Sequence, residues 1–307
     1  MSAGIQKSWV INEAGAQLTI KEFLQNKQGF SRRLLTAMKQ EGGKFLINEQ
    51  ESYITETLRK NDKLTVIFPD EVSDGIEATE MNLAIIYEDE DHLVLNKPAG
   101  QACLPGMNDR QYSLANGIQA YYNASGHPAT VHIVTRLDRD TSGLVLVAKN
   151  RYAHALLSEA QKKNQIHRTY EAIITGEMTP SAGTVRAPIA RRKTSIIERE
   201  VNWEDGKEAT THYETVSTLS GASFLRIQLE TGRTHQIRVH FSHLGHPLLG
   251  DDLYGGSTDA LERQALHCTA IEWEHPFEHK KMQFHCMLPS DMAACKKSLS
   301  IDYPGNL

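Results

Sequence analysis

The chain lacks long hydrophobic runs, a cysteine framework and an excess of positive charge. Its most apolar run, Leu144–Ala148, is far shorter than the ~18–20 residues that cross a bilayer. Residues 1–15 have no basic start followed by an apolar core, so we expect no secretory signal. The cysteines at positions 103, 268, 286 and 295 form no C-x-x-C pair. We therefore expect free thiols in a cytoplasmic protein that has no contact with a membrane.

The charge balance excludes a broad binder of polyanions but not a selective one. Among 307 residues, 33 Lys and Arg stand against 38 Asp and Glu, which gives a net charge of −5. The charge is uneven, because residues 1–70 carry 10 basic and 8 acidic side chains and residues 70–91 carry nine acidic and no basic ones. Any nucleic acid must therefore be bound by local basic patches.

The first 70 residues have the pattern of a small module with two helices. Thr19 and Glu22 form a capping box, which predicts a helix that begins near residue 20. Ser31 is expected to cap a second helix over residues 31–40, with its leucines and Met38 on one face. The apolar runs at 45–47 and 64–68 predict strands.

The remainder divides into an acidic linker, residues 71–84, and a larger domain, residues 85–307. Short β-like runs at 93–95, 144–148, 170–174 and 224–229 alternate irregularly with helical stretches at 113–122, 151–163 and 236–244. Strands outnumber helices and no regular βαβ pattern is present. These features predict an α+β domain built on a mixed sheet.

The densest polar cluster is the segment Arg136–Gly143, directly before the apolar run. Asp138 and Asp140 alternate here with Arg136 and Arg139. A carboxylate that nearby arginines keep ionised can act on a glycosidic carbon. The spacing alone favours the other interpretation, a turn that is held together by ion pairs.

A second polar cluster, Thr231–His240, spans a turn and the start of a helix. Arg233 stands just ahead of that helix, where the helix dipole disfavours a cation. An arginine at such a place indicates that it meets an anion.

Several ordered segments of the larger domain resemble the RluA-type pseudouridine synthases. Arg136-Leu-Asp-Arg-Asp-Thr-Ser-Gly143 and Thr231-Gly-Arg-Thr-His-Gln-Ile-Arg-Val-His240 look like the signature segments of that family. Asp91–Gly100, Gly245–Gly255 and Ala265–His267 match its other segments in the same order. The resemblance implies a mainly antiparallel pseudouridine synthase fold and the isomerisation of uridine in RNA.

The resemblance also implies roles for particular residues. Asp138 would be the essential aspartate, Arg233 its ion-pair partner and Tyr170 the aromatic residue that packs on the target base. Substrate binding would fall to Arg136, Arg139, His235 and Arg238. The family often has His before Arg-Leu-Asp, whereas this chain has Thr135. The reaction transfers no group and changes no oxidation state, so we expect no cofactor.

The N-terminal segment, residues 17–69, resembles the alpha-L RNA-binding module of a ribosomal protein and of several RNA-modifying enzymes. Arg32, Arg33 and Lys44 would be its RNA contacts. Because this module accompanies ribosomal RNA enzymes of the family, ribosomal RNA is the expected partner and transfer RNA the second choice. We expect a monomer.

Two other functions fit parts of the pattern. His235, His240, His243 and His246 crowd one helix and suggest a metallohydrolase, but no H-E-x-x-H motif supports a metal, and we expect none. A non-catalytic RNA-binding factor with this fold would not need Asp138, Tyr170 and Arg233 together. Further RNA contacts are expected from Lys97, Arg168 and a basic hairpin that contains Arg186, Arg191, Arg192, Lys193 and Arg199.

Overall fold

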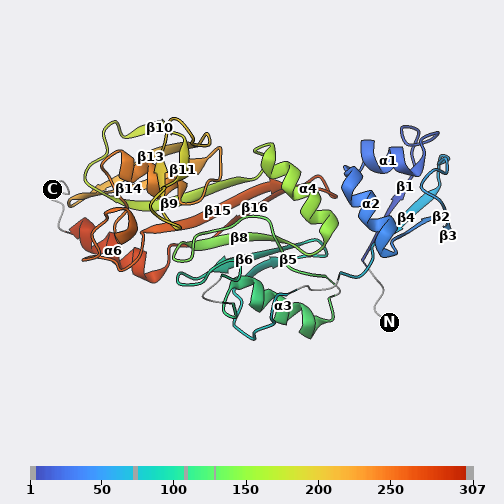
Figure 1. Ribbon diagram of the computed structural model, residues 1–307, viewed down its shortest axis with the longest axis horizontal. Coiled ribbons are helices and arrows are strands. Elements are labelled where there is room, and N and C mark those ends of the chain that lie inside the picture. Colours follow the sequence, from blue (N-terminus) through green and yellow to red (C-terminus); the bar gives the residue numbers. More distant parts are fainter. Residues whose placement is uncertain (1–4, 72–74, 107–109, 128, 302–307) are drawn as a thin grey trace.

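A computed structural model of the protein describes residues 5–71, 75–106, 110–127 and 129–301. A small N-terminal domain lies at one end of an elongated sheet domain (Figure 1). No helix in these ranges is both long and apolar enough to reach across a membrane.

The N-terminal domain places two helices against a four-stranded antiparallel sheet in the order β1-β4-β2-β3. The predicted capping box forms, because Thr19 and Glu22 exchange hydrogen bonds at the start of α1. Ser31 caps α2, whose Leu34, Leu35 and Met38 are buried, as predicted. The elements are β1 Gln6–Val10, α1 Ile20–Asn26, α2 Arg32–Glu41, β2 Lys44–Ile47, β3 Gln50–Glu51 and β4 Lys63–Ile67.

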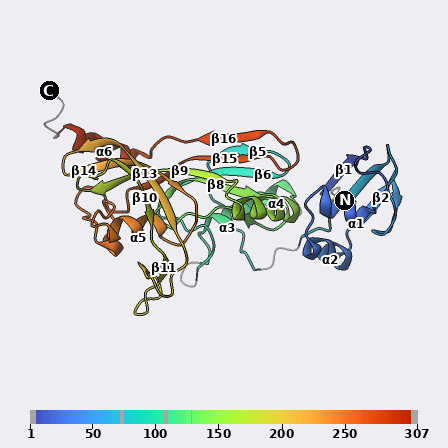
Figure 2. The ribbon, with the colours of Figure 1, turned by 90° about the horizontal axis from the view of Figure 1, so that it is seen from above.

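The larger domain is built on a mixed, mainly antiparallel sheet, which confirms the predicted α+β class. The sheet path runs β10-β13-β14-β9-β15-β8-β6-β5, with β16 beside β15 and β7 beside β8. Its strands are β5 Ile85–Glu88, β6 His92–Lys97, β7 His132–Ile133, β8 Ser142–Ala148, β9 His167–Thr175, β10 Ala182–Arg186, β13 Thr210–Leu219, β14 Ala222–Leu229, β15 Leu266–Glu274 and β16 Lys281–His285. A separate hairpin, β11 Ile189–Arg191 and β12 Arg199–Val201, projects from the domain (Figure 2).

Strand β8 lies at the centre of this domain. All seven of its residues are buried, and it pairs antiparallel with β6 and parallel with β15. Helices α3 and α4 lie on the same side of the sheet (Figure 2). The helices are α3 Leu114–Ser125, α4 Arg151–Lys162, α5 Gln236–His243, the 3₁₀ turn η1 Asp252–Tyr254 and α6 Ser290–Ile301.

The N-terminal domain is seated on the start of α4. The Tyr152 ring packs 4.1 Å from Phe30 and 5.3 Å from Phe68, measured between ring centroids. Its hydroxyl donates to the Gln28 carbonyl oxygen at 2.7 Å. Arg151 pairs with Glu41 of α2 at 2.5 Å, so apolar and charged contacts both fix the two domains.

Part of the expected acidic linker packs on the larger domain instead of projecting into solvent. The buried carboxylate of Glu71 lies 2.6 Å from His132 Nε2 and accepts a hydrogen bond from the Arg151 backbone N–H at 2.8 Å. Farther along, Asn116 of α3 donates to the Glu77 carbonyl oxygen at 2.6 Å. Residues 72–74 lie outside the described residues, and the boundaries at 70 and 85 stay predictions.

Candidate active site

The loop between β7 and β8 carries Asp138, and hydrogen bonds from Lys97 hold this loop in place. The buried ammonium of Lys97 donates to the carbonyl oxygens of Pro98, Gln101 and Arg139 at 2.7, 2.7 and 2.9 Å. Burial lowers the pKa of Lys97 to about 8. The expectation that Lys97 contacts RNA is therefore wrong. Its ammonium group is buried and donates to the backbone of Arg139, the residue next to Asp138.

Asp138 forms its ion pair with Arg238. Arg238 Nη1 lies 3.5 Å from Asp138 Oδ2, and the Arg238 side chain is buried. Arg238 Nε and Nη2 donate to the two carboxylate oxygens of the buried Asp251, each at 2.7 Å. Burial opposes the charge of Arg238, but the hydrogen bonds that it donates to Asp251 outweigh burial and raise the pKa of Arg238. A fixed cation thus lies beside the Asp138 carboxylate.

The structure corrects one expectation about the arginines. Arg233 was expected to pair with Asp138, but its exposed guanidinium donates from Nε to the Glu208 carbonyl oxygen at 2.9 Å. It has no ion pair with a carboxylate among the described residues. The reason is position, since Arg233 precedes helix α5 whereas Arg238 lies on the buried face of its first turn. Arg238 lines the cavity while two carboxylates of the protein hold its guanidinium, and its expected contact with substrate stays a prediction.

Tyr170 lies on β9 at the wall of the same cavity. Its residue is buried, with 4% exposed, and the Arg168 guanidinium lies 5.9 Å from its ring centroid. Burial raises the pKa of Tyr170, so its phenol is neutral at physiological pH. The ring can therefore offer an apolar surface to a base, but it carries no standing phenolate to take up a proton.

His235 lines the same cavity and contacts Tyr254. His235 Nδ1 lies 2.8 Å from the Tyr254 hydroxyl, and the Tyr254 ring lies 4.9 Å from the Arg238 guanidinium. Burial lowers the pKa of His235, which favours the neutral imidazole. Sequence reasoning missed Asp251 and Tyr254, although both stand in the quoted segment Gly245–Gly255. Their place in that segment was the available signal.

One cavity brings most of the predicted residues together. Its lining includes Arg136, Asp138, Tyr170, Arg233, His235 and Arg238. The neighbouring cavity adds Arg139, whose Nε donates to the Gly100 carbonyl oxygen at 3.1 Å. Thr135 does not reach either cavity, because it is fully buried and its hydroxyl accepts a hydrogen bond from the Leu146 N–H at 2.9 Å. The residue that departs from the family pattern thus supports β8.

The crowded histidines of α5 point to separate partners. His240 is buried between the Thr211 hydroxyl and the Ala187 carbonyl oxygen, each at 2.9 Å, and His246 Nδ1 lies 2.9 Å from the Thr175 carbonyl oxygen. His243 is exposed at the end of the helix. Among the described residues these imidazoles form no group that could hold a metal.

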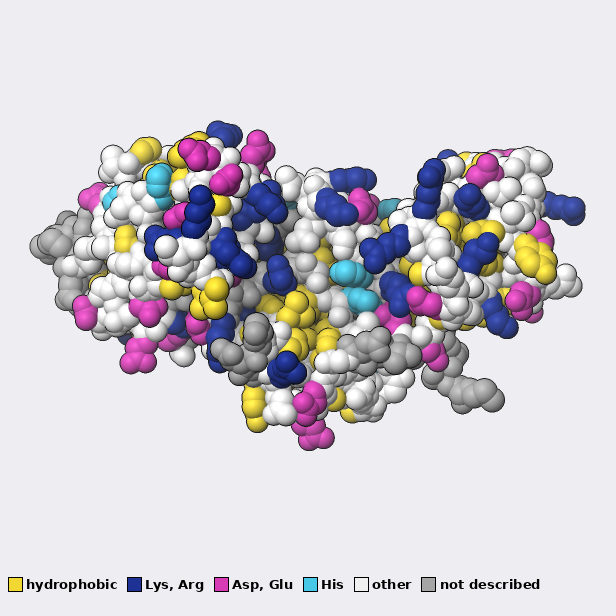
Figure 3. All heavy atoms as spheres, viewed as in Figure 1, with side chains coloured by type: hydrophobic (Ala, Val, Ile, Leu, Met, Phe, Trp, Pro, Cys, Tyr) yellow, Lys and Arg dark blue, Asp and Glu magenta, His cyan; other side chains and the backbone are white. Residues whose placement is uncertain are grey.

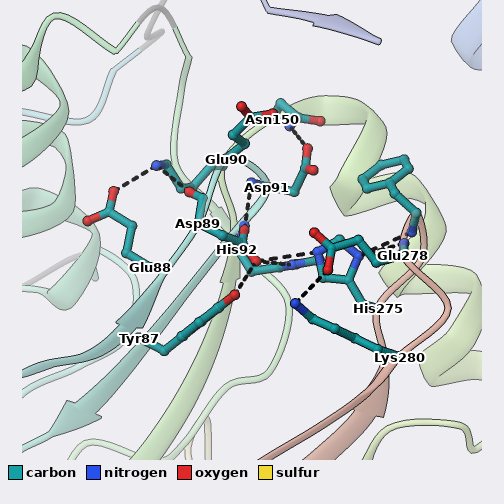
Figure 4. Close-up of polar contacts among 12 residues, drawn as sticks. Tyr87, Glu88, Asp89, Glu90, Asp91, His92, Asn150, His275, Glu278 and Lys280 are labelled. Atoms are coloured by element: carbon teal, nitrogen blue, oxygen red, sulfur yellow. Dashed lines mark hydrogen bonds and ion pairs between the residues drawn. The ribbon is translucent and has the colours of Figure 1, made fainter. Parts of the chain in front are cut away.

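A different trio, Asp89, His92 and His275, does bring potential metal ligands within 4.8 Å of one another (Figure 4). Asp89 already accepts hydrogen bonds from the Tyr87 hydroxyl and from the backbone N–H groups of Asp91 and His92. His275 Nδ1 accepts from two backbone N–H groups, so in the neutral ring Nε2 carries the proton and points it at Asp89, 3.3 Å away. This tautomer makes the trio a hydrogen-bonded network that secures the β5–β6 turn.

Most of the basic residues expected to contact RNA lie on the surface, but Lys97 is buried and Arg168 and Arg199 are half-buried. Figure 3 shows Lys and Arg side chains spread over one face, from the larger domain to the N-terminal domain. In the hairpin, Arg192 pairs with Glu198 at 2.8 Å, whereas Arg191 and Lys193 are exposed without such a pair among the described residues. In the N-terminal domain Arg32 and Arg33 are exposed on the first turn of α2, and Lys44 lies 3.5 Å from Glu51.

Comparisons with known proteins identify close relatives. A sequence model described as RNA pseudouridylate synthase matches residues 91–243. An uncharacterised RNA pseudouridine synthase of Bacillus subtilis, YjbO, is 47% identical over 90% of this chain and 97% of the relative. Ribosomal large subunit pseudouridine synthase D of Yersinia pestis is 41% identical over 73% of this chain and 72% of the relative. The solved structure of human RNA pseudouridylate synthase domain containing 1 has a TM-score of 0.57 at 25% identity, covering 70% of this chain and 87% of that one.

Proposed function

The chain belongs to the RNA pseudouridylate synthase family, and we propose that it isomerises uridines of ribosomal RNA with Asp138 as the essential carboxylate. The observation that carries the role of Asp138 is its position, since its carboxylate lines a cavity beside the fixed cation of Arg238. The ribosomal substrate is suggested by a relative named as an enzyme of the large ribosomal subunit.

The reaction requires the N1–C1′ glycosidic bond to break and a C5–C1′ bond to form. N1 gains a proton and C5 loses one, so the isomerisation is balanced without an oxidant or a group donor. The Arg238 guanidinium lies 3.5 Å from the Asp138 carboxylate, and both possible roles of that carboxylate require its ionised form. Asp138 either attacks C1′ or removes a proton from C2′. A primary isotope effect with uridine deuterated at C2′ would select the second route, and its absence would select the first.

The target nucleotide must leave its stack to reach Asp138, at a cost of a few kcal/mol. We propose that stacking on Tyr170 returns ~1–3 kcal/mol of this cost. Arg136 and Arg139 line the cavity next to Asp138, and we propose that they hold the phosphates on either side of the flipped nucleotide. Arg233 is exposed at the same mouth, and its proposed role is to meet the charge of the substrate.

The test compares pseudouridine maps of ribosomal and transfer RNA from three strains: intact, deleted for this gene, and carrying Asp138→Asn. We expect one or a few ribosomal uridines to stay unmodified in both mutant strains. Sites lost only from transfer RNA would overturn the ribosomal substrate. Full modification by Asp138→Asn, with loss in the deletion strain, would overturn the role of Asp138.

The N-terminal domain is proposed to act as an alpha-L type RNA-binding module with Arg32, Arg33 and Lys44 as contacts. The arginines are exposed on α2, and the domain has the two helices and the sheet that the sequence resemblance implies. Exchange of all three residues for Gln should weaken RNA binding while turnover of bound RNA continues. Unchanged affinity of this variant for the target RNA would contradict the proposal.

A further inference from the structure

A second groove lies at the junction of the two domains, away from Asp138. Its walls are α2, which contributes Ser31, Arg33 and Gln40, and α4, which contributes Arg151 and His154, with His132 of β7 beside them. The groove has a volume of about 810 Å³. It exists only because the two domains meet, so neither domain contains it alone.

The groove is held open by the contacts that dock the domains. Tyr152 packs into the N-terminal domain next to Phe30 and Phe68, and Arg151 is paired with Glu41. His132 and His154 stack with ring centroids 5.0 Å apart. The walls are therefore set before any ligand arrives, which lowers the ordering cost of binding.

The side chains that line the groove suit a phosphate backbone. Arg33 is exposed and has no hydrogen-bonding or ion-pair partner among the described residues. Arg151 adds a second guanidinium, whose charge is shared with Glu41. Burial lowers the pKa of His154 to about 4, so it offers a neutral imidazole to a hydrogen-bonding ligand. The lining thus carries the unpaired Arg33 and the Arg151–Glu41 ion pair, and this positive balance matches a polyanion better than an apolar peptide.

Helix α4 connects this groove with the cavity that holds Asp138. Arg151 and His154, near its start, line the groove, whereas Gln161 and Lys162, at its end, line the cavity next to Asp138, Arg136 and Arg139. Eleven helical steps of ~1.5 Å separate Arg151 from Lys162, which is about 16 Å. In Figure 3, Lys and Arg side chains lie along this face on both sides of a group of histidines.

We propose that the groove between α2 and α4 is a second RNA-binding site, which holds the backbone of the substrate about five nucleotides from the target uridine. The number follows from the 16 Å span of α4 and a rise of ~3.4 Å per stacked nucleotide. The inference rests on the proposed role of the Asp138 cavity as the place where the target nucleotide is bound.

The test measures binding of the full-length Asp138→Asn protein to RNA fragments centred on the uridine that the deletion strain leaves unmodified. One fragment extends ten nucleotides on both sides of this uridine, and the other only three. Arg33→Ala is compared with Lys39→Ala, a charge removal on the same helix at an exposed residue that does not line the groove. Arg33→Ala should weaken binding of the long fragment about five- to tenfold and reduce its salt slope by ~0.7–0.9, the value for one lost phosphate contact.

With the short fragment Arg33→Ala should bind as tightly as the Lys39→Ala control. Equal effects of both substitutions, or a loss that persists with the short fragment, would overturn the second site. Competition by an acidic peptide but not by the long RNA would assign the groove to a protein partner. A wrong role for Asp138 would be detected separately. The Asp138→Asn protein would then still modify RNA, whether or not its RNA affinity depends on the length of the fragment.

Discussion

At the residue scale, the pairing of Arg238 with two carboxylates makes it important for folding as well as for chemistry. Arg238→Gln leaves the buried Asp251 carboxylate without its cation, so we expect a loss of ~3–5 kcal/mol in the free energy of unfolding. Urea titration measures it. Arg233→Gln is the matched control, because its exposed side chain should cost under ~0.5 kcal/mol. Equal losses would contradict the geometry described here.

Because of Lys97, we expect the activity of the site to depend on pH in the alkaline range. Its pKa lies near 8 in the folded protein, below the ordinary value of 10.5. Above pH 8 the neutral amine has only two N–H groups for three carbonyl oxygens, so we expect the Asp138 loop to loosen and kcat to fall. Between pH 8 and 10.5 the unfolded chain binds more protons, so this group makes the fold more stable as pH rises.

The measurement is a kcat profile from pH 6 to 10, with unfolding followed over the same range. Lys97→Met should have a low kcat at every pH and no alkaline limb near 8. A limb that persists in Lys97→Met would assign the titration to another group.

Single residues show clearly where sequence reasoning succeeded. Asp138, Tyr170 and Arg233 do line one cavity, as their segments implied. The partner of Asp138 was wrong, because spacing along the chain does not say which arginine around a helix start points inward. His235 takes a left-handed backbone, with φ 57°, between Arg233 and Arg238, and such a turn separates the directions of its neighbours.

At the scale of elements, the parallel contact of β8 with β15 depends on Gly143. Its φ is +117°, and a Cβ there would lie 2.3 Å from the Cys268 carbonyl oxygen on β15. We expect Gly143→Ala to cost well over ~2 kcal/mol, since the backbone of a central strand cannot move away. Gly221→Ala, at φ +63° with nothing within 4 Å, should cost only the ~1–2 kcal/mol of its backbone conformation. Thermal unfolding compares the two, and similar losses would contradict the close contact.

Local signals predicted about half of the elements, whereas β13, β15, β16 and α6 were among those missed, because long-range signals were not available. Caps at Thr19 and Ser31 and the apolar run of β8 placed helices and strands within a few residues. The pairing of His267 with Ser142 joins residues far apart in sequence, and no local pattern encodes it. The short strands β1 and β3 were also missed, because each is stabilised by its neighbours in the sheet.

At the scale of the whole molecule, Tyr152 is expected to decide how firmly the two domains are joined. Tyr152→Ala removes an aromatic ring that packs on Phe30, Phe68 and Phe277, so the N-terminal domain should lose its fixed position. Small-angle scattering should then show a larger radius of gyration. Tyr152→Phe is the control, since it keeps the ring and loses only the bond to Gln28, worth ~1 kcal/mol. An unchanged radius in Tyr152→Ala would mean that the ion pairs suffice.

The net charge of the chain could not predict the groove between the two domains. The sequence places its positive charge in scattered segments, and only the folded chain brings Arg33 and Arg151 to one groove. Composition rightly excluded a broad basic surface, but the position of a domain is a tertiary property. The apolar contacts that determine it involve residues from four separate parts of the chain.

The aromatic contact between the domains also has a consequence in time. Phe30 and Phe68 are synthesised early, whereas Tyr152, whose ring covers both, follows Phe68 by 84 residues. At ~5–20 residues per second, the ribosome needs roughly 4 to 17 s to supply it. During this interval the nascent N-terminal domain presents an uncovered aromatic face, which makes it a natural client for the chaperones that attend the ribosome exit.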